Sequence, residues 1–297
     1  MMKKRTAAIG LLMSLLPLGQ PLVIKTGVAL TTAGLIFSIP EEANAESAVS
    51  YYNQGNNKYD AGDYSGAISD YDKAIEIDPK YTYAYLNRGI SKENLKDYLG
   101  AISDFKKAIE IDPTYASAYN SLAIIKDAQL KDPYGAISDY NKAIKINPNY
   151  AIAYYNRGIA KVVLKDYSGA ISDYSKAIEL NPNYTNAYIN RGQIKDAQLK
   201  DPYGSISDYN KAIKINPNYA IAYYNRGIAK SKIGDISGAI SDYSKVIEIN
   251  PNYVYAYGNR GVEKNKIGDI KGACSDWTQA SGFGNEDAAR WLKEYCQ

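Results

Sequence analysis

The chain has 297 residues, a formal net charge of +3, no histidine and two cysteines. Without histidine the most usual general base and metal ligand are missing, and two cysteines are too few for a zinc cluster. Basic and acidic residues are mixed along the chain and form no dense basic stripe, which argues against nucleic-acid binding. We therefore expect a protein that is not an enzyme, holds no metal and needs no cofactor.

Residues 1–45 differ in composition from the rest of the chain. Three cations at residues 3–5 precede an apolar run over residues 6–24, and Lys25 separates this run from a second one over residues 26–39. Ala43-Asn44-Ala45 matches the small-residue pattern of a signal-peptidase site, which predicts cleavage near Ala45. The protein would then be exported to a periplasmic, lumenal or extracellular location.

This segment has two alternative interpretations. The apolar stretch is long for a signal peptide, and translation from Met13 would leave a more ordinary one. A retained anchor is the other alternative, with membrane association through residues 6–39 and the N-terminal cations in the cytoplasm. Both interpretations place the remaining chain outside the cytoplasm.

The remaining chain is periodic. Its prolines recur at steps of 34 or 35 residues, at Pro79, Pro113, Pro148, Pro182, Pro217 and Pro251. A fixed period of this size indicates an array of stacked units and not one globular core. We expect seven repeats over residues 48–284, at about 48–81, 82–115, 116–150, 151–184, 185–219, 220–253 and 254–284.

Each repeat has the pattern of two helices joined by a turn. In the second half of the first repeat, Ala67, Tyr71 and Ala74 recur at helical spacing. Asp63 precedes this half as a helix N-cap, and Pro79 follows it because proline cannot continue a helix. One aspartate stands directly before the aromatic residue of these second helices. We expect this series to lie on a solvated helix face: Asp70, Asp104, Asp139, Asp173, Asp208 and Asp242.

A longer period is superimposed on the first. Residues 126–161 and 195–230 lie 69 residues apart and differ only at Ala136 and Ser205. Both segments contain the extra residue of the 35-residue repeats, within the shared sequence KDAQLKDPYG. A two-repeat segment has therefore been duplicated, which extends a surface but rarely builds a new active site.

The C-terminal residues 285–297 follow the last repeat. Trp291, Leu292 and Tyr295 recur on one side of a predicted helix, which we expect to cap the open end of the array. Cys274 lies in the seventh repeat and Cys296 in this final segment. Either a disulfide between them pins the cap, or both remain buried free thiols.

These columns resemble the tetratricopeptide repeat, in which an aromatic residue, Gly, Ala, a second aromatic, Ala and Pro follow at fixed offsets. Residues 220–251 give the best match, and the resemblance covers residues 48–284. It implies an all-α fold, namely a right-handed superhelical solenoid of tandem helix–turn–helix hairpins with a C-terminal capping helix.

In this family the first helix of each hairpin lines the concave wall. The matching positions here are apolar and rich in tyrosine, a residue that gives a large contact area with a hydrogen-bonding tip. We expect them to bind a partner through Tyr52, Tyr83, Leu86, Tyr155, Ile159, Tyr224, Ile228 and Tyr255. The alternative is that these side chains pack between neighbouring repeats. The family's clamp for a terminal carboxylate is not expected, because Tyr52 and Leu86 replace its lysine.

The resemblance implies a non-catalytic scaffold that holds a protein or peptide partner on the concave surface, outside the cytoplasm. The main alternative is a membrane-tethered assembly or secretion factor that uses the same repeats. Two weaker alternatives are a carrier of a small apolar ligand and an enzyme that depends on the carboxylates. The sequence does not name the partner.

Overall fold

The computed structural model describes residues 47–296, and the predicted signal or anchor segment 1–45 lies outside these residues. The described chain is all-α, with fifteen helices, and divides into two compact units at Ile111 and Asp112. Unit 1 contains α1 (Ala48–Asp60), α2 (Tyr64–Ile77), α3 (Thr82–Asn94) and α4 (Tyr98–Ile111). Within residues 47–296, none of the helices has the length and apolar character needed to span a membrane.

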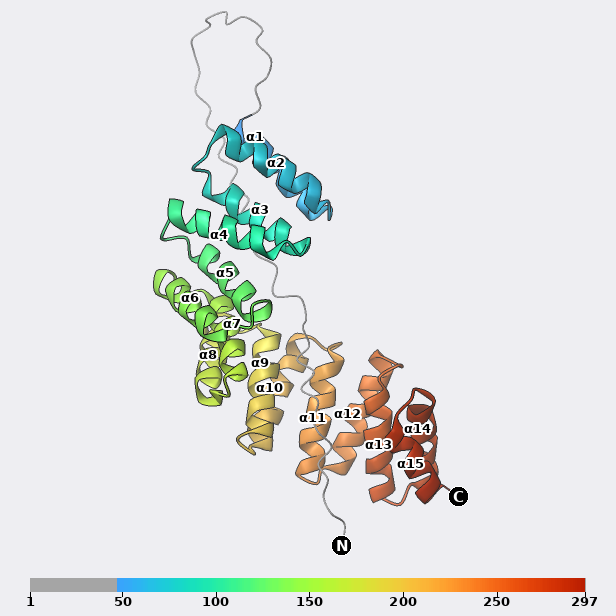
Figure 1. The fold of residues 1–297 in the computed structure, drawn as a ribbon. Helices are drawn as coiled ribbons and strands as arrows, with labels where there is room; N and C mark the ends of the chain where they lie inside the picture. The colour runs from blue at the N-terminus through green and yellow to red at the C-terminus, as the bar shows by residue number, and fades with distance from the viewer. Residues whose placement is uncertain (1–46, 297) are drawn as a thin grey trace, which may run out of the picture. The chain divides into compact units, whose positions relative to one another are not determined.

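Unit 2 contains the remaining helices. They are α5 (Ala116–Ala128), α6 (Pro133–Ile146), α7 (Ala151–Val163), α8 (Tyr167–Leu180), α9 (Thr185–Ala197), α10 (Pro202–Ile215), α11 (Ala220–Lys232), α12 (Ile236–Ile249), α13 (Val254–Lys266), α14 (Ile270–Gly282) and α15 (Glu286–Tyr295). In both units the helices pair into hairpins that pack on one another in chain order (Figure 1). This confirms the predicted all-α arrangement of hairpins.

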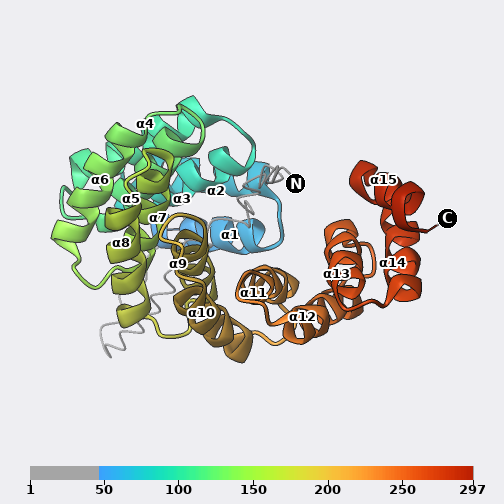
Figure 2. The same cartoon turned by 90° about the horizontal axis from the view of Figure 1, so that it is seen from below.

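The odd-numbered helices α1 to α13 are the first helices of the hairpins, and the even-numbered helices α2 to α14 are the second helices. Figure 2 shows the first helices α9, α11 and α13 on one side of unit 2 and the second helices α10, α12 and α14 on the other. Alanines line the contacts between helices: Ala170, Ala177 and Ala187 are all fully buried in one cluster. Aromatic rings of the second helices fill the remaining core, as Tyr174 and Trp277 do.

The second helices start at an aspartate cap. In the first such helix the Asp63 Oδ1 accepts a hydrogen bond from the Gly66 N–H at 2.8 Å, and the same bond recurs at the other second helices of residues 47–296. Only glycine fits three residues after the cap, because a Cβ added at Gly66 would lie 2.0 Å from the Asp63 Oδ2. The capped starts of these helices are therefore encoded locally, as the sequence predicted.

The turn before this cap needs a left-handed backbone. Gly62 and Gly234 adopt it with φ of 82° and 83° in two hairpins, whereas Lys131 and Lys165 adopt it with φ of 54° and 61° in two others. A residue with a Cβ is strained in this region, while glycine is not. The lysine turns therefore store a small amount of strain that the glycine turns avoid.

The final helix α15 covers the end of unit 2. Its Trp291 ring lies 5.5 Å from the ring of Trp277 on α14, and Ala288 is fully buried in the same cluster. Cys274 on α14 is joined by a disulfide to Cys296, with the two Cα atoms 5.8 Å apart. The last apolar surface of the array is thus shielded from water.

Candidate partner-binding surface

One stripe of residues recurs along the first helices. In α7 it consists of Ile152, Tyr155, Ile159 and Val163, and in α11 of Ile221, Tyr224, Ile228 and Lys232. Steps of three and four residues place the members of each set on one side of their helix. We call this the first-helix stripe, and it contains most of the residues that the sequence analysis assigned to partner binding.

Tyrosines of the stripe are held by the next repeat. The Tyr155 ring lies 4.7 Å from the ring of Tyr184 and 5.7 Å from that of Tyr174. Its hydroxyl accepts a hydrogen bond from the Asn190 Nδ2 on α9 at 3.2 Å. Burial raises the pKa of Tyr155 to about 12, because the charged phenolate loses its hydration there.

The same arrangement recurs at α11. The Tyr224 ring packs against Tyr253 at 5.0 Å, and its hydroxyl accepts a hydrogen bond from the Asn259 Nδ2 at 3.2 Å. Burial also raises the pKa of Tyr224. The asparagines therefore serve contacts between repeats, and these amides do not form a clamp for a terminal carboxylate.

In unit 1 the corresponding tyrosine is deeper. Tyr52 is only 5% exposed, because the rings of Tyr71 and Tyr81 lie 5.9 Å and 5.1 Å from it and Asn87 donates to its hydroxyl. Leu86 is buried to the same extent. These two predicted anchors therefore belong to the core and offer a partner at most an edge. The tyrosine content of the stripe, visible in the sequence, does not distinguish buried from exposed rings.

Two predicted residues reach the surface. Tyr83 is 40% exposed at the start of α3, 6.1 Å from Tyr81 and 6.5 Å from Tyr52. Tyr255 is 55% exposed at the start of α13, and its neighbouring hydroxyl adds to the burial that raises the pKa of Tyr253. Each unit therefore presents an exposed tyrosine beside a packed tyrosine pair.

The predicted isoleucines lie between these two extremes. Ile159 packs against the cluster around Tyr174, and Ile228 against the cluster around Tyr243. Both remain partly exposed. They support the tyrosines of the stripe from within the same helix and contribute apolar area next to them.

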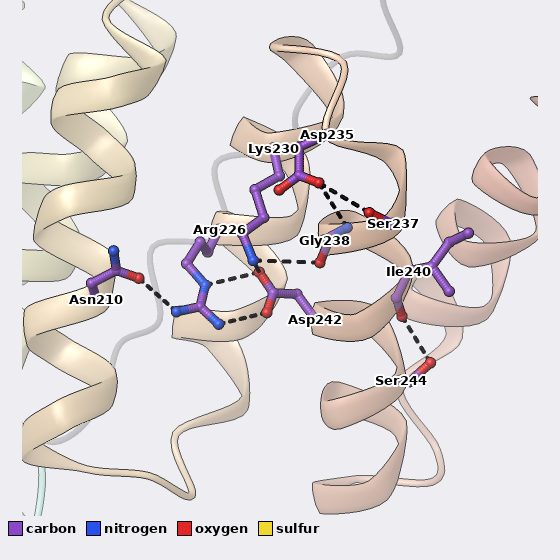
Figure 3. A network of polar contacts seen from close by, with 9 residues as sticks. All are labelled: Asn210, Arg226, Lys230, Asp235, Ser237, Gly238, Ile240, Asp242 and Ser244. Atoms are coloured by element: carbon purple, nitrogen blue, oxygen red, sulfur yellow. Dashed lines mark hydrogen bonds and ion pairs between the residues drawn. The ribbon is translucent and has the colours of Figure 1, made fainter.

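The aspartate series of the second helices is not solvated, contrary to the sequence-based expectation. Figure 3 shows Asp242, whose Oδ1 and Oδ2 accept hydrogen bonds from the Arg226 Nη2 at 2.6 Å and the Arg226 Nε at 2.8 Å. The Lys230 Nζ lies 2.9 Å from the Asp242 Oδ2. Asp242 is 3% exposed, and a buried carboxylate is tolerated only with such pairing.

The same arginine also joins neighbouring hairpins. The Arg226 Nη1 donates to the Asn210 Oδ1 on α10 at 2.6 Å (Figure 3). Equivalent bidentate pairs hold Asp104, Asp173, Asp208 and Asp276. We call this arrangement the arginine clamp. The signal for it was present in the sequence, since an arginine recurs 16 or 17 residues before each of these aspartates.

Comparison with known families identifies the repeats. The tetratricopeptide repeat model matches residues 82–115, 151–184 and 220–253, and a second model of the TPR repeat matches residues 55–96, 134–162 and 204–234. The chain therefore belongs to the tetratricopeptide repeat family, whose repeats are typically non-catalytic scaffolds for protein–protein interaction. A comparison with curated proteins gives no significant match.

Solved structures with similar folds include three of this kind. MamA is 28% identical over 55% of this chain and 94% of its own, with a TM-score of 0.51. YrrB, described as a TPR protein with an unusual peptide-binding site, is 24% identical over 64% of this chain and 97% of its own, with a TM-score of 0.56. The C-terminal part of a TPR repeat-containing protein from Cytophaga hutchinsonii is 19% identical over 81% of this chain and 99% of its own, with a TM-score of 0.65.

Proposed function

We propose that this scaffold holds an extended or helical segment of a protein partner along the first-helix stripe, which corresponds to the concave surface of the family. One observation carries the proposal: Tyr255 exposes more than half of its side chain beside the packed pair Tyr224–Tyr253. A tyrosine with a fixed backbone and rigid neighbours gives a large contact area at low entropic cost, which is typical of binding hot spots. Tyr83 is the counterpart in unit 1.

The test separates binding from folding. The partner is first identified by capture from native cell envelopes with the full chain, and its affinity is then measured with purified components. Tyr255→Ala should weaken binding at least about tenfold, as loss of a hot-spot tyrosine does, while helicity and melting stay unchanged. Tyr134→Ala is the matched control, because Tyr134 is 74% exposed but lies at the start of a second helix. Equal effects of both variants would contradict the proposal.

We further propose that the repeats work outside the cytoplasm. The Ala43-Asn44-Ala45 pattern and the disulfide between Cys274 and Cys296 support this location, because disulfides persist in oxidising compartments. N-terminal sequencing of the mature protein distinguishes cleavage near Ala45 from a retained anchor. A mature protein that is recovered from the cytoplasm with two free thiols would refute this location.

A further inference from the structure

The duplicated segment provides an internal comparison on the first-helix stripe. Asp127 near the end of α5 and Asp196 near the end of α9 occupy the same position in the two copies. The copies end at Lys161 and Lys230, and the sequences diverge directly afterwards. The next repeat therefore places different side chains beside two equivalent carboxylates.

In the second copy the carboxylate is paired within the chain. Lys232, the last residue of α11, places its Nζ 2.6 Å from the Asp196 Oδ2. The Asp196 side chain is only 10% exposed, so this lysine compensates much of its lost hydration. A cation at the end of one first helix thus reaches the carboxylate of the preceding first helix.

In the first copy the corresponding cation is missing. Val163, the last residue of α7, stands where α11 has Lys232, and it is 53% exposed. Within residues 47–296 no lysine or arginine forms an ion pair with Asp127, and the nearby Lys131 donates from its Nζ to the Ala128 carbonyl at 2.9 Å. Partial burial raises the pKa of Asp127, because its charged form is incompletely hydrated.

We propose that Asp127 receives a lysine or arginine side chain of the bound partner, in the place that Lys232 takes against Asp196. The exposed Val163 offers apolar surface for the aliphatic part of that side chain. This inference rests on the proposed function and specifies it: the partner segment carries a cation beside an apolar contact. Asp196 cannot act in the same way, because Lys232 already occupies it.

The first experiment needs no partner. Val163→Lys recreates the pairing of the second copy, so the pKa of Asp127, followed by NMR in the full chain, should fall below that of the wild type. Val163→Met is the control and should leave the pKa of Asp127 unchanged. If Val163→Lys leaves it unchanged too, the two positions are not equivalent and the inference is overturned.

The second experiment uses an array of short immobilised peptides as the probe, in which each lysine- or arginine-containing peptide is paired with its glutamine-substituted version. The full chain should prefer the cationic member of a pair. Asp127→Asn and Val163→Lys should each reduce that preference about tenfold, as loss of a partly buried charge pair does. Asp196→Asn is the matched control and should retain it.

The outcomes separate the two levels of the argument. Peptides that bind the wild type and Asp127→Asn equally, yet are lost with Tyr255→Ala, overturn the inference and leave the proposed function intact. Absence of binding by the wild type, or binding that survives Tyr255→Ala, contradicts the proposed function and with it the inference.

Discussion

The hairpins α5–α6 and α11–α12 belong to the same unit and share their helix lengths, yet they differ in what stabilises them. In α11–α12 the buried Asp242 is held by the clamp of Arg226 and Lys230. In α5–α6 the clamp position holds Leu122, and the buried Asp139 pairs with Lys126 at 2.5 Å and with Lys142 at 3.1 Å.

This comparison shows that one repeat fold tolerates two ways of pairing a buried carboxylate. The planar guanidinium of Arg226 satisfies both oxygens of Asp242 at once and also joins the preceding hairpin, whereas each lysine contributes a single point charge. The two hairpins also differ at the stripe, where α11 has Tyr224 and α5 has Asn120.

The largest expected effect comes from removing the clamped carboxylate. Asp242→Ala leaves two cations without their partner, of which Arg226 is only 17% exposed, and should lower the free energy of unfolding by about 3–5 kcal/mol. Asp139→Ala should cost about 1–2 kcal/mol, because its lysines can return to water. Urea denaturation followed by circular dichroism measures both losses. Equal losses would show that the clamp adds nothing to the pairing with lysine.

A smaller effect is expected from converting the clamped hairpin to the other type. Arg226→Leu copies the residue of α5–α6 and leaves Lys230 as the partner of Asp242. The loss of three hydrogen bonds to a charged donor should reduce the free energy of unfolding by about 1–3 kcal/mol. Arg226→Lys should recover little of it, since an ammonium cannot replace the bidentate contact. Full recovery would point to charge alone.

The tyrosine of α11 should make stability depend on alkaline pH. Burial raises the pKa of Tyr224 above the ordinary value of 10.0, so the folded protein keeps this proton where the unfolded chain releases it. The stabilisation is therefore complete below pH 10 and falls as the pH rises further, by about 1 kcal/mol for each pH unit. Tyr224→Phe should unfold with a shallower pH dependence above pH 10. A slope identical to that of the wild type would contradict this assignment.

The smallest expected effect concerns the turns. Lys131 adopts a φ of 54° in the α5–α6 turn, where the α11–α12 turn has Gly234 with a φ of 83°. Lys131→Gly should raise the free energy of unfolding by about 0.5–1 kcal/mol, because glycine adopts this backbone without strain. Lys131→Ala is the control and should bring no gain. A gain for both variants would mean that the lysine side chain, and not the backbone, is unfavourable.

Much of the fold could be predicted from local signals. Asp63 and its equivalents mark the starts of the second helices, and the periodic prolines follow their ends, because capping and termination act within one or two turns. The same reasoning gave the wrong environment for Asp242, since its Arg226 partner lies on another helix. The stripe was predicted as a set, but the burial of Tyr52 depends on rings that the following helices supply.

The sequence by itself determined the number, length and order of the hairpins and the position of the duplicated segment, because these are repeated local patterns. The tertiary structure decided which polar groups are paired and which tyrosines stay exposed. Asp127 and Asp196 illustrate the reason: identical segments carry them, and a single side chain of the next repeat, Val163 or Lys232, sets their different environments. Such contacts join residues about one repeat apart, beyond the range of any helical periodicity.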